Sequence, residues 1–237
     1  LLLSAEPVIH TVAVHERCGT EVEILPSRQW YIDVLSQKER YRQAADEIVW
    51  HPAQMKDRYL SWVENLKWDW CISRQRYYGV PFPVWYEGTC ACGCTEFLPE
   101  SAVLDTWATS SVTPLLHKSR GLPEYPLSMR THAHEIIRTW TFYSIVRSLY
   151  HTGKLPWKHL MISGFVLAKR GEKISKSKGN GLEPTSLIRE HSADALRLWA
   201  ANARLGTDTF FSPADLQPEK RFLTKLWNAA RFALPLL

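Results

Sequence analysis

A glycine-bounded loop carries the residue types that polyphosphate chemistry requires. Between Gly171 and Gly181 the chain places three lysines and two serines, namely Lys173, Ser175, Lys176, Ser177 and Lys178. Lysine is a compact, flexible cation that suits phosphate groups, and serine hydroxyls and glycine-exposed amides add hydrogen-bond donors. The glycines allow the segment to close over a ligand and reopen. A solvated basic turn would have the same composition, so the order of the residues has to decide.

The order of residues in this loop resembles a known signature. Residues 173–177, Lys-Ile-Ser-Lys-Ser, resemble the Lys-Met-Ser-Lys-Ser motif of class I aminoacyl-tRNA synthetases, with Ile174 in the place of methionine. Further stretches resemble valyl-tRNA synthetases, a class Ia family, and in particular their archaeal-type branch: residues 69–79, 105–111, 134–140, 158–182 and 192–212. The resemblance covers nearly the whole chain in the family's order.

The resemblance implies a role for each loop residue. Lys173 and Lys176 would hold the phosphates of ATP, supplied with Mg²⁺, while the carboxylate of the amino acid attacks the α-phosphorus and pyrophosphate leaves. The physical reason is stabilisation of the charge that develops in the transition state. Ser175 and Ser177 would assist or order the loop, and Lys178 would be a spectator.

The rest of the ATP site is implied by two further segments. The family's Gly-x-Asp pattern matches Ala133-His134-Glu135, so Glu135 would accept hydrogen bonds from the ribose; an acidic residue is also common in any first helical turn. His132 would line the same pocket or be structural. Phe165 and Val166 resemble the segment that packs on adenine, although a strand end of this kind also suits a core.

Three residues match positions near the amino-acid side chain. Trp107 and Tyr78 would be aromatic walls for a small branched aliphatic substrate, with plain core packing as the alternative. Asp105 would position its loop or bind the substrate's amine. Aromatic walls discriminate weakly, because one methylene is worth only about 1–3 kcal/mol.

A cysteine cluster raises the question of zinc. The sequence Cys90-Ala91-Cys92-Gly93-Cys94 has single-residue spacings, whereas structural zinc usually takes cysteine pairs with two or more intervening residues. Related synthetases have two separated pairs here, and Glu87 stands where a cysteine is expected. The expectation is therefore an incomplete zinc site, either decayed or missing part of its insert.

The elements that must position these residues alternate between short strands and helices. Apolar runs at residues 70–73, 103–104 and 160–163 are typical of strands. Residues 36–67, where Pro52 opens a second helix, and residues 133–150 and 219–234 are typical of helices. Gly153 is expected to end the helix at 133–150, and Ser192 to cap a further helix. Residues 1–30 indicate short extended segments, and Ser36 is a candidate cap for the first helix. This alternation predicts an α/β fold with a Rossmann-like parallel sheet. Ligands bind beyond the carboxyl ends of such strands, where residues 73–75, 105–107 and 164–165 are expected to lie.

The family resemblance divides the chain into four parts. Residues 1–83 would be the return from an editing insertion plus part of the catalytic domain, and residues 84–102 the cysteine-bearing insert. Residues 103–212 would be the second half of the Rossmann catalytic domain, and residues 213–237 the first helix of a helical anticodon-binding domain.

Composition and charge agree with a nucleotide-binding protein. The 237 residues carry a net charge of +5, which suits a polyanionic partner. There is no uncharged apolar run of about 18 residues, so no membrane span is expected. Five unevenly spread cysteines indicate a reducing compartment, the cytoplasm.

The function that the resemblance implies is ATP-dependent ligation of valine to tRNA(Val). The second class I signature, His-x-Gly-His, does not occur in these 237 residues, so a missing N-terminal half would have to supply it. The alternatives are a non-catalytic relative that binds nucleotide or tRNA, and a sister synthetase for isoleucine or leucine.

Overall fold

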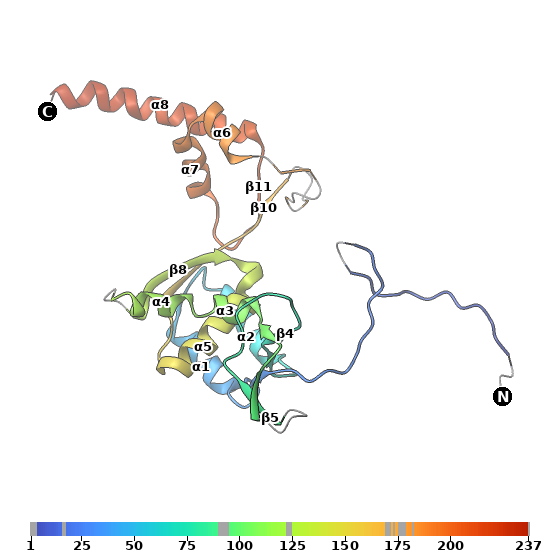
Figure 1. Cartoon of the computed structure of the whole chain (residues 1–237). Helices are drawn as coiled ribbons and strands as arrows, with labels where there is room; N and C mark the ends of the chain where they lie inside the picture. Colours follow the sequence, from blue (N-terminus) through green and yellow to red (C-terminus); the bar gives the residue numbers. More distant parts are fainter. Residues whose placement is uncertain are drawn as a thin grey trace.

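The computed structural model describes residues 4–15, 18–89, 95–121, 125–168, 172, 174, 179–181 and 183–236. None of the helices in these ranges combines the length and apolar character needed to span a bilayer. Figure 1 shows a long extended N-terminal segment leading into a body of short strands and helices, and a separate group of helices at the C-terminal end. Within the described part of residues 4–30, Val14 and Glu21 form an isolated bridge.

A three-stranded parallel sheet forms the centre of the body. Its order is β2 (Val49–His51), β9 (Trp157–Ser163) and β8 (Leu127–Ala133). The central strand β9 buries Trp157, Leu160 and Ile162, as expected for a strand with neighbours on both edges. Its last residue, Ser163, pairs with the last residue of β8, Ala133. The predicted parallel sheet is confirmed, with β9 at the predicted run.

Three helices contribute to the hydrophobic core around β9: α1 (Lys38–Glu47), α2 (Met55–Glu64) and α5 (Phe142–Thr152). Tyr41 of α1 and Tyr59 of α2 are buried, and Tyr41 meets the Phe142 ring edge-on at 5.5 Å between ring centroids. The predicted helical region 36–67 is therefore two helices with β2 between them. Ser36 is not the cap of α1, because its hydroxyl donates to Asp33 and the N-cap position is Gln37.

The predicted helix at 133–150 is confirmed in its second half and irregular in its first. It begins as a short 3-10 helix, η1 (His134–Ile136), continues as one π-helical segment, η2 (Ile137–Thr141), and only then becomes α5. Gly153 ends α5 in the left-handed conformation, at φ 68°, and donates its backbone N–H to Leu149. Glycine adopts this conformation without the steric cost of a side chain.

Two of the predicted strands lie in small antiparallel ladders and not in the parallel sheet. β1 (Tyr31–Ile32) pairs with β3 (Trp70–Cys71), and β4 (Ser73–Arg74) pairs with β7 (Val103–Leu104). The prediction that Ser73 and Asp105 lie at the carboxyl edge of the parallel sheet is therefore wrong. A parallel pair needs a crossover, usually a helix, whereas β4 and β7 are separated by a hairpin, β5 (Trp85–Thr89) and β6 (Thr95–Pro99).

The hairpin is tied to the body through Glu100. The carboxylate of Glu100 accepts hydrogen bonds from the Tyr86 hydroxyl at 2.5 Å and from the Trp30 indole at 2.9 Å. The bond from Tyr86 is the main reason, followed by the Ala102 backbone N–H, that the pKa of Glu100 falls to about 2. Beyond the hairpin lie β7 and two short helices, α3 (Thr106–Ser110) and α4 (Thr113–Ser119).

The C-terminal helices form a second, smaller cluster around Leu187, Phe211 and Leu216. Figure 1 shows α6, α7 and α8 together, linked to the body by the β10–β11 pair. Ser192 caps α7 as predicted, with its hydroxyl 3.3 Å from the backbone N–H of Ala195. The elements are β10 (Val166–Leu167), α6 (Pro184–His191), α7 (Ala193–Asn202), β11 (Thr209–Phe210), η4 (Pro213–Asp215), α8 (Leu216–Ala233) and η5 (Leu234–Leu236).

Candidate active site

The candidate site lies where β8 and β9 end side by side. Because Ala133 pairs with Ser163, the residues that follow each strand, His134 and Gly164, emerge at the same edge of the sheet. In parallel α/β sheets this carboxyl edge is where ligands bind. The structure thus brings together two of the predicted ATP-binding segments, which are about 30 positions apart in the sequence.

A cavity of about 740 Å³ opens at this edge. Glu135 and Phe165, both predicted to bind ATP, are among its lining residues. The others come from α2 and from the start of the helix after β8; they are Asp57, Arg58, Ser61, His134, Ile137 and Arg138. The wall therefore combines two carboxylates, two guanidinium groups, an imidazole and an aromatic face. Such a mixture of polar groups and one ring suits a nucleoside with charged substituents.

His134 and Phe165 are held together at the rim of this cavity. Their rings meet edge to face, with 4.6 Å between centroids. The Nε2–H of His134 donates to the carboxylate of Asp208 at 2.8 Å, and the backbone N–H of Phe165 donates to the same oxygen at 2.8 Å. The hydrogen bond from His134 is the first cause, and that from Phe165 the second, of the lowered pKa of Asp208.

His132 lies behind the site, where both of its ring nitrogens are hydrogen-bonded within the protein. Nδ1 is 2.7 Å from the carbonyl of Ala133, and Nε2 is 2.6 Å from the hydroxyl of Thr141. A carbonyl only accepts, so Nδ1 carries the proton and Nε2 accepts from Thr141. Burial lowers the pKa of His132, which favours this neutral ring. Of the two roles predicted for His132, these contacts favour the structural one.

Val166 lines a second, smaller hollow and not the 740 Å³ cavity. It is 42% exposed and lines a cavity of about 200 Å³ between the end of β9 and helix α7, together with Trp199 and Ala203. Phe165 lines both this hollow and the larger cavity. Phe165 is therefore the better placed of the two to contact a base.

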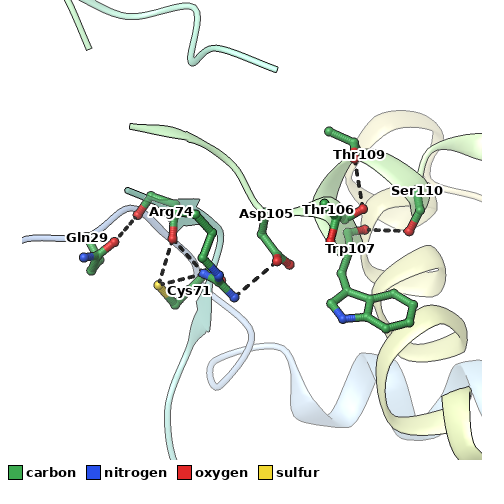
Figure 2. A network of polar contacts seen from close by, with 9 residues as sticks. Gln29, Cys71, Arg74, Asp105, Thr106, Trp107, Thr109 and Ser110 are labelled. Atoms are coloured by element: carbon green, nitrogen blue, oxygen red, sulfur yellow. Dashed lines mark hydrogen bonds and ion pairs between the residues drawn. The ribbon is translucent and has the colours of Figure 1, made fainter. Parts of the chain in front are cut away.

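Asp105 belongs to a separate polar network at the start of α3. Figure 2 shows the Arg74 guanidinium reaching toward the Asp105 carboxylate, with the Trp107 indole on the adjoining helix. The ion pair is 3.2 Å long, and the side chain of Asp105 is only 7% exposed. Arg74 also donates to the backbone carbonyls of Ser73 and Cys71. The second carboxylate oxygen of Asp105 is buried and has no hydrogen-bond partner in the described part of the chain.

The two predicted aromatic walls differ in their surroundings. Trp107 is half-buried and packs against the main core. Tyr78 is 89% exposed, in a loop whose Gly79 lies against Val103. Neither residue lines the 740 Å³ cavity.

The loop residues Lys173, Ser175, Lys176 and Ser177 and the cysteines Cys90, Cys92 and Cys94 lie outside the described residues. Ahead of the loop, β10 ends at Leu167, and Ala168 donates its backbone N–H to the carbonyl of Glu172. Within the described ranges no group of three or more histidine, cysteine or acidic side chains is arranged to hold a metal ion.

Sequence reasoning missed the wall that α2 contributes. Asp57, Arg58 and Ser61 lie on an ordinary helix about 75 positions before Glu135, and no local motif marks them. Their one-face spacing, at i and i+3 or i+4, is a weak signal shared by most solvated helix faces. Asp208, the residue that joins His134 to Phe165, was missed for the same reason.

The sequence matches one family of proteins. A family model of class I tRNA synthetases (I, L, M and V) matches residues 16–96 and 89–212, and the chain belongs to this family. Among curated proteins, the Valine--tRNA ligase of Anaplasma marginale is 44% identical over 98% of this chain, and that of Rickettsia conorii is 42% identical over 98%. The chain spans about a third of the length of these relatives, 32% and 33% respectively.

Solved structures share the fold at lower identity. Mycobacterium tuberculosis methionyl-tRNA synthetase in complex with methionyl-adenylate superposes with a TM-score of 0.66 and 20% identity, covering 89% of this chain and 40% of that one. An Agrobacterium radiobacter LeuRS in a ternary complex with tRNA and LeuAMS gives a TM-score of 0.60 and 20% identity, covering 71% and 28%. The α/β architecture expected from the sequence is thus the one seen in synthetases.

Proposed function

We propose that this chain is the carboxyl-side part of the catalytic domain of a valine–tRNA ligase, which forms valyl-adenylate from valine and ATP and transfers valine to tRNA(Val). The observation that carries the proposal is the meeting of His134-Glu135 and Gly164-Phe165 at the carboxyl edge of the parallel sheet. The names of the relatives, each Valine--tRNA ligase, support valine as the amino acid. The assignment to the archaeal-type branch is proposed from the sequence alone.

The adenosine of ATP fits the 740 Å³ cavity. Glu135 would accept hydrogen bonds from the ribose hydroxyls, and the Phe165 ring, fixed edge-on by His134, would flank the base. Val166 would extend that wall if the base reached toward α7. Lys173 and Lys176 would neutralise the phosphates, where Mg²⁺ accompanies ATP, and Ser175 and Ser177 would add donors.

Valine would bind near Asp105 and Trp107. The buried oxygen of Asp105, which has no hydrogen-bond partner among the described residues, is a suitable acceptor for an ammonium group, because a charged donor there would compensate a carboxylate taken out of water. Trp107 beside it supplies an apolar face. Tyr78 is too exposed to enclose a substrate unless another part of the protein covers it.

The remaining parts follow the family's order. Residues 1–83 would return from the editing insertion, 84–102 would form the cysteine-bearing insert without a complete zinc site, 103–212 the second Rossmann half, and 213–237 the start of the anticodon-binding helices. The His-x-Gly-His signature would come from an N-terminal half in the same cytoplasmic protein.

Replacing Lys176 tests the proposal. In the protein at its native length, Lys176→Ala should slow valine-dependent exchange of pyrophosphate into ATP by about 100-fold or more, with an unchanged melting temperature, because a transition-state charge contact is lost. Lys178→Ala removes an equal charge from the same loop and is the matched control, with an expected change below about threefold.

Three results would contradict the proposal. Equal losses in the two variants would show that only the loop's overall charge matters. Exchange that depends on isoleucine or leucine and not on valine would assign the chain to a sister synthetase, and no exchange with any amino acid would favour the non-catalytic relative. The 237-residue chain alone is expected to activate valine poorly, since its sequence lacks His-x-Gly-His.

A further inference from the structure

Asp208 joins two segments that the proposed function places on opposite parts of the nucleotide. One carboxylate oxygen of Asp208 accepts from the His134 imidazole and from the Phe165 backbone N–H, each at 2.8 Å. His134 precedes Glu135, the proposed ribose ligand, and Phe165 is the proposed adenine contact. The three residues come from three separate stretches of the chain, with Asp208 lying 74 positions from His134 and 43 positions from Phe165.

The backbone around Asp208 is fitted closely to the end of β9. A Cβ added to Gly164 would lie 2.1 Å from the carbonyl oxygen of Thr207, so the two segments of backbone are in direct contact here. Thr209 donates its N–H to the Phe165 carbonyl at 2.8 Å, where the parallel pairing of β11 with β10 begins. This fit leaves little freedom for Asp208 to move away from its two donors.

The carboxylate acts from behind the site. Asp208 is not among the residues that line the 740 Å³ cavity, whereas His134, Glu135 and Phe165 are. The side chain of His134 is 12% exposed and that of Asp208 is 40% exposed, so the shared hydrogen bond is partly shielded from water. A shielded, charge-assisted bond is stronger than an exposed one. Arg58, another cavity residue, also lies within electrostatic range of Asp208.

We propose that Asp208 is a positioning residue for ATP: through His134 and Phe165 it fixes the ribose turn and the adenine strand end relative to each other, without touching the nucleotide. The inference rests on the proposed function for the identity of the ligand. It predicts that the loss of Asp208 weakens ATP binding and leaves valine binding nearly unchanged, because Asp105 and Trp107 belong to a separate network.

The test compares Asp208 with a structural aspartate of the same segment. Asp215 accepts the backbone N–H of Ser212 at 2.7 Å in the cap of η4 and lines no part of the cavity. In the protein at its native length, Asp208→Ala should weaken ATP binding, measured by calorimetry without valine, and raise KM for ATP, each by about tenfold, with KM for valine changing less than about twofold. Asp215→Ala should lower the melting temperature only.

A conservative variant keeps the test decisive if Asp208→Ala does not fold. Asp208→Asn retains an oxygen that accepts the Phe165 N–H but loses the charge, so its ATP affinity should lie between those of the wild type and the alanine variant. Unchanged ATP affinity in both variants, or equal changes in KM for ATP and for valine, would overturn the inference.

The two proposals fail in different ways. A wild-type protein that binds ATP and shows the Asp208 effect but has no amino-acid-dependent exchange would refute the ligase and leave the positioning role standing. A wild-type protein that binds no ATP would refute both.

Discussion

The ion pair between Arg74 and Asp105 should contribute more to the free energy of unfolding than a shorter ion pair on the surface. Arg74 and Asp105 are 3.2 Å apart, and the side chains are 42% and 7% exposed. Arg42 and Glu64 are only 2.8 Å apart, but their side chains are 47% and 52% exposed. Water screens the second pair on both sides, whereas the Asp105 carboxylate is shielded, so burial and not distance should decide.

Removing Arg74 leaves a buried charge without its partner. Breaking a fully buried pair costs about 3–5 kcal/mol, and because Arg74 is itself partly exposed we expect about 2 kcal/mol for Arg74→Ala. The matched surface variant, Arg42→Ala, should cost about 0.5 kcal/mol or less. The free energy of unfolding is measured by urea denaturation at pH 7, followed by tryptophan fluorescence.

A double-mutant cycle separates the charge from the packing. Asp105→Asn removes the buried charge and keeps the shape, so in that background Arg74→Ala should cost about 1–2 kcal/mol less than it does in the wild type. The reasoning fails if Arg74→Ala destabilises the protein no more than Arg42→Ala does, or if the two substitutions at positions 74 and 105 are additive within about 0.3 kcal/mol.

Three further predictions each test a single feature of the fold. Gly164→Ala should lower the free energy of unfolding by about 2 kcal/mol or more, since the added Cβ would overlap the Thr207 carbonyl. Gly153→Ala has open space but φ 68°, so it should cost only about 1 kcal/mol, and thermal unfolding compares the two variants. Glu100 has a pKa of about 2 in the folded protein against an ordinary 4.5, so its stabilising effect is complete above pH 4.5 and is lost as the pH falls toward 2. In the Glu100→Gln variant, the free energy of unfolding should therefore no longer fall in this pH range on account of residue 100. Ser192→Ala should lower the free energy of unfolding by about 1 kcal/mol through loss of the cap. Ser192→Gly should lower it by less than about 0.5 kcal/mol, because glycine accepts φ 83° without strain, and thermal unfolding followed by circular dichroism separates the two variants.

Local signals predicted the elements that local chemistry controls. Gly153 and Ser192 end and begin helices because of conformations and hydrogen bonds within a few residues, and both predictions are confirmed. The strand β9 was predicted from an apolar run, because the positions that it buries in the core are occupied by apolar side chains. Strand β8, with mostly exposed residues over Leu127–Ala133, has no such pattern and is a strand because β9 pairs with it.

The candidate site was predictable where a motif marked it and not where packing made it. Glu135 and Phe165 lie together at the cavity as the sequence indicated. Arg58 reaches the cavity, and Asp208 reaches His134 and Phe165 behind it, through tertiary contacts that no spacing along the chain encodes. The roles of Lys173 and Lys176 stay predictions, since these residues lie outside the described ranges.

The pairing of β2 with β9 bears on how the protein forms during synthesis. His51 and His159 are neighbours on paired strands, with ring nitrogens 3.2 Å apart, yet 108 positions separate them in the chain. At about 5–20 residues per second, a ribosome needs on the order of 5–20 seconds to deliver β9 after β2. During that time the edge of β2, with Val49 and Trp50, is unpaired and exposed to other hydrophobic surfaces. We therefore expect the nascent chain to need chaperone protection in this interval.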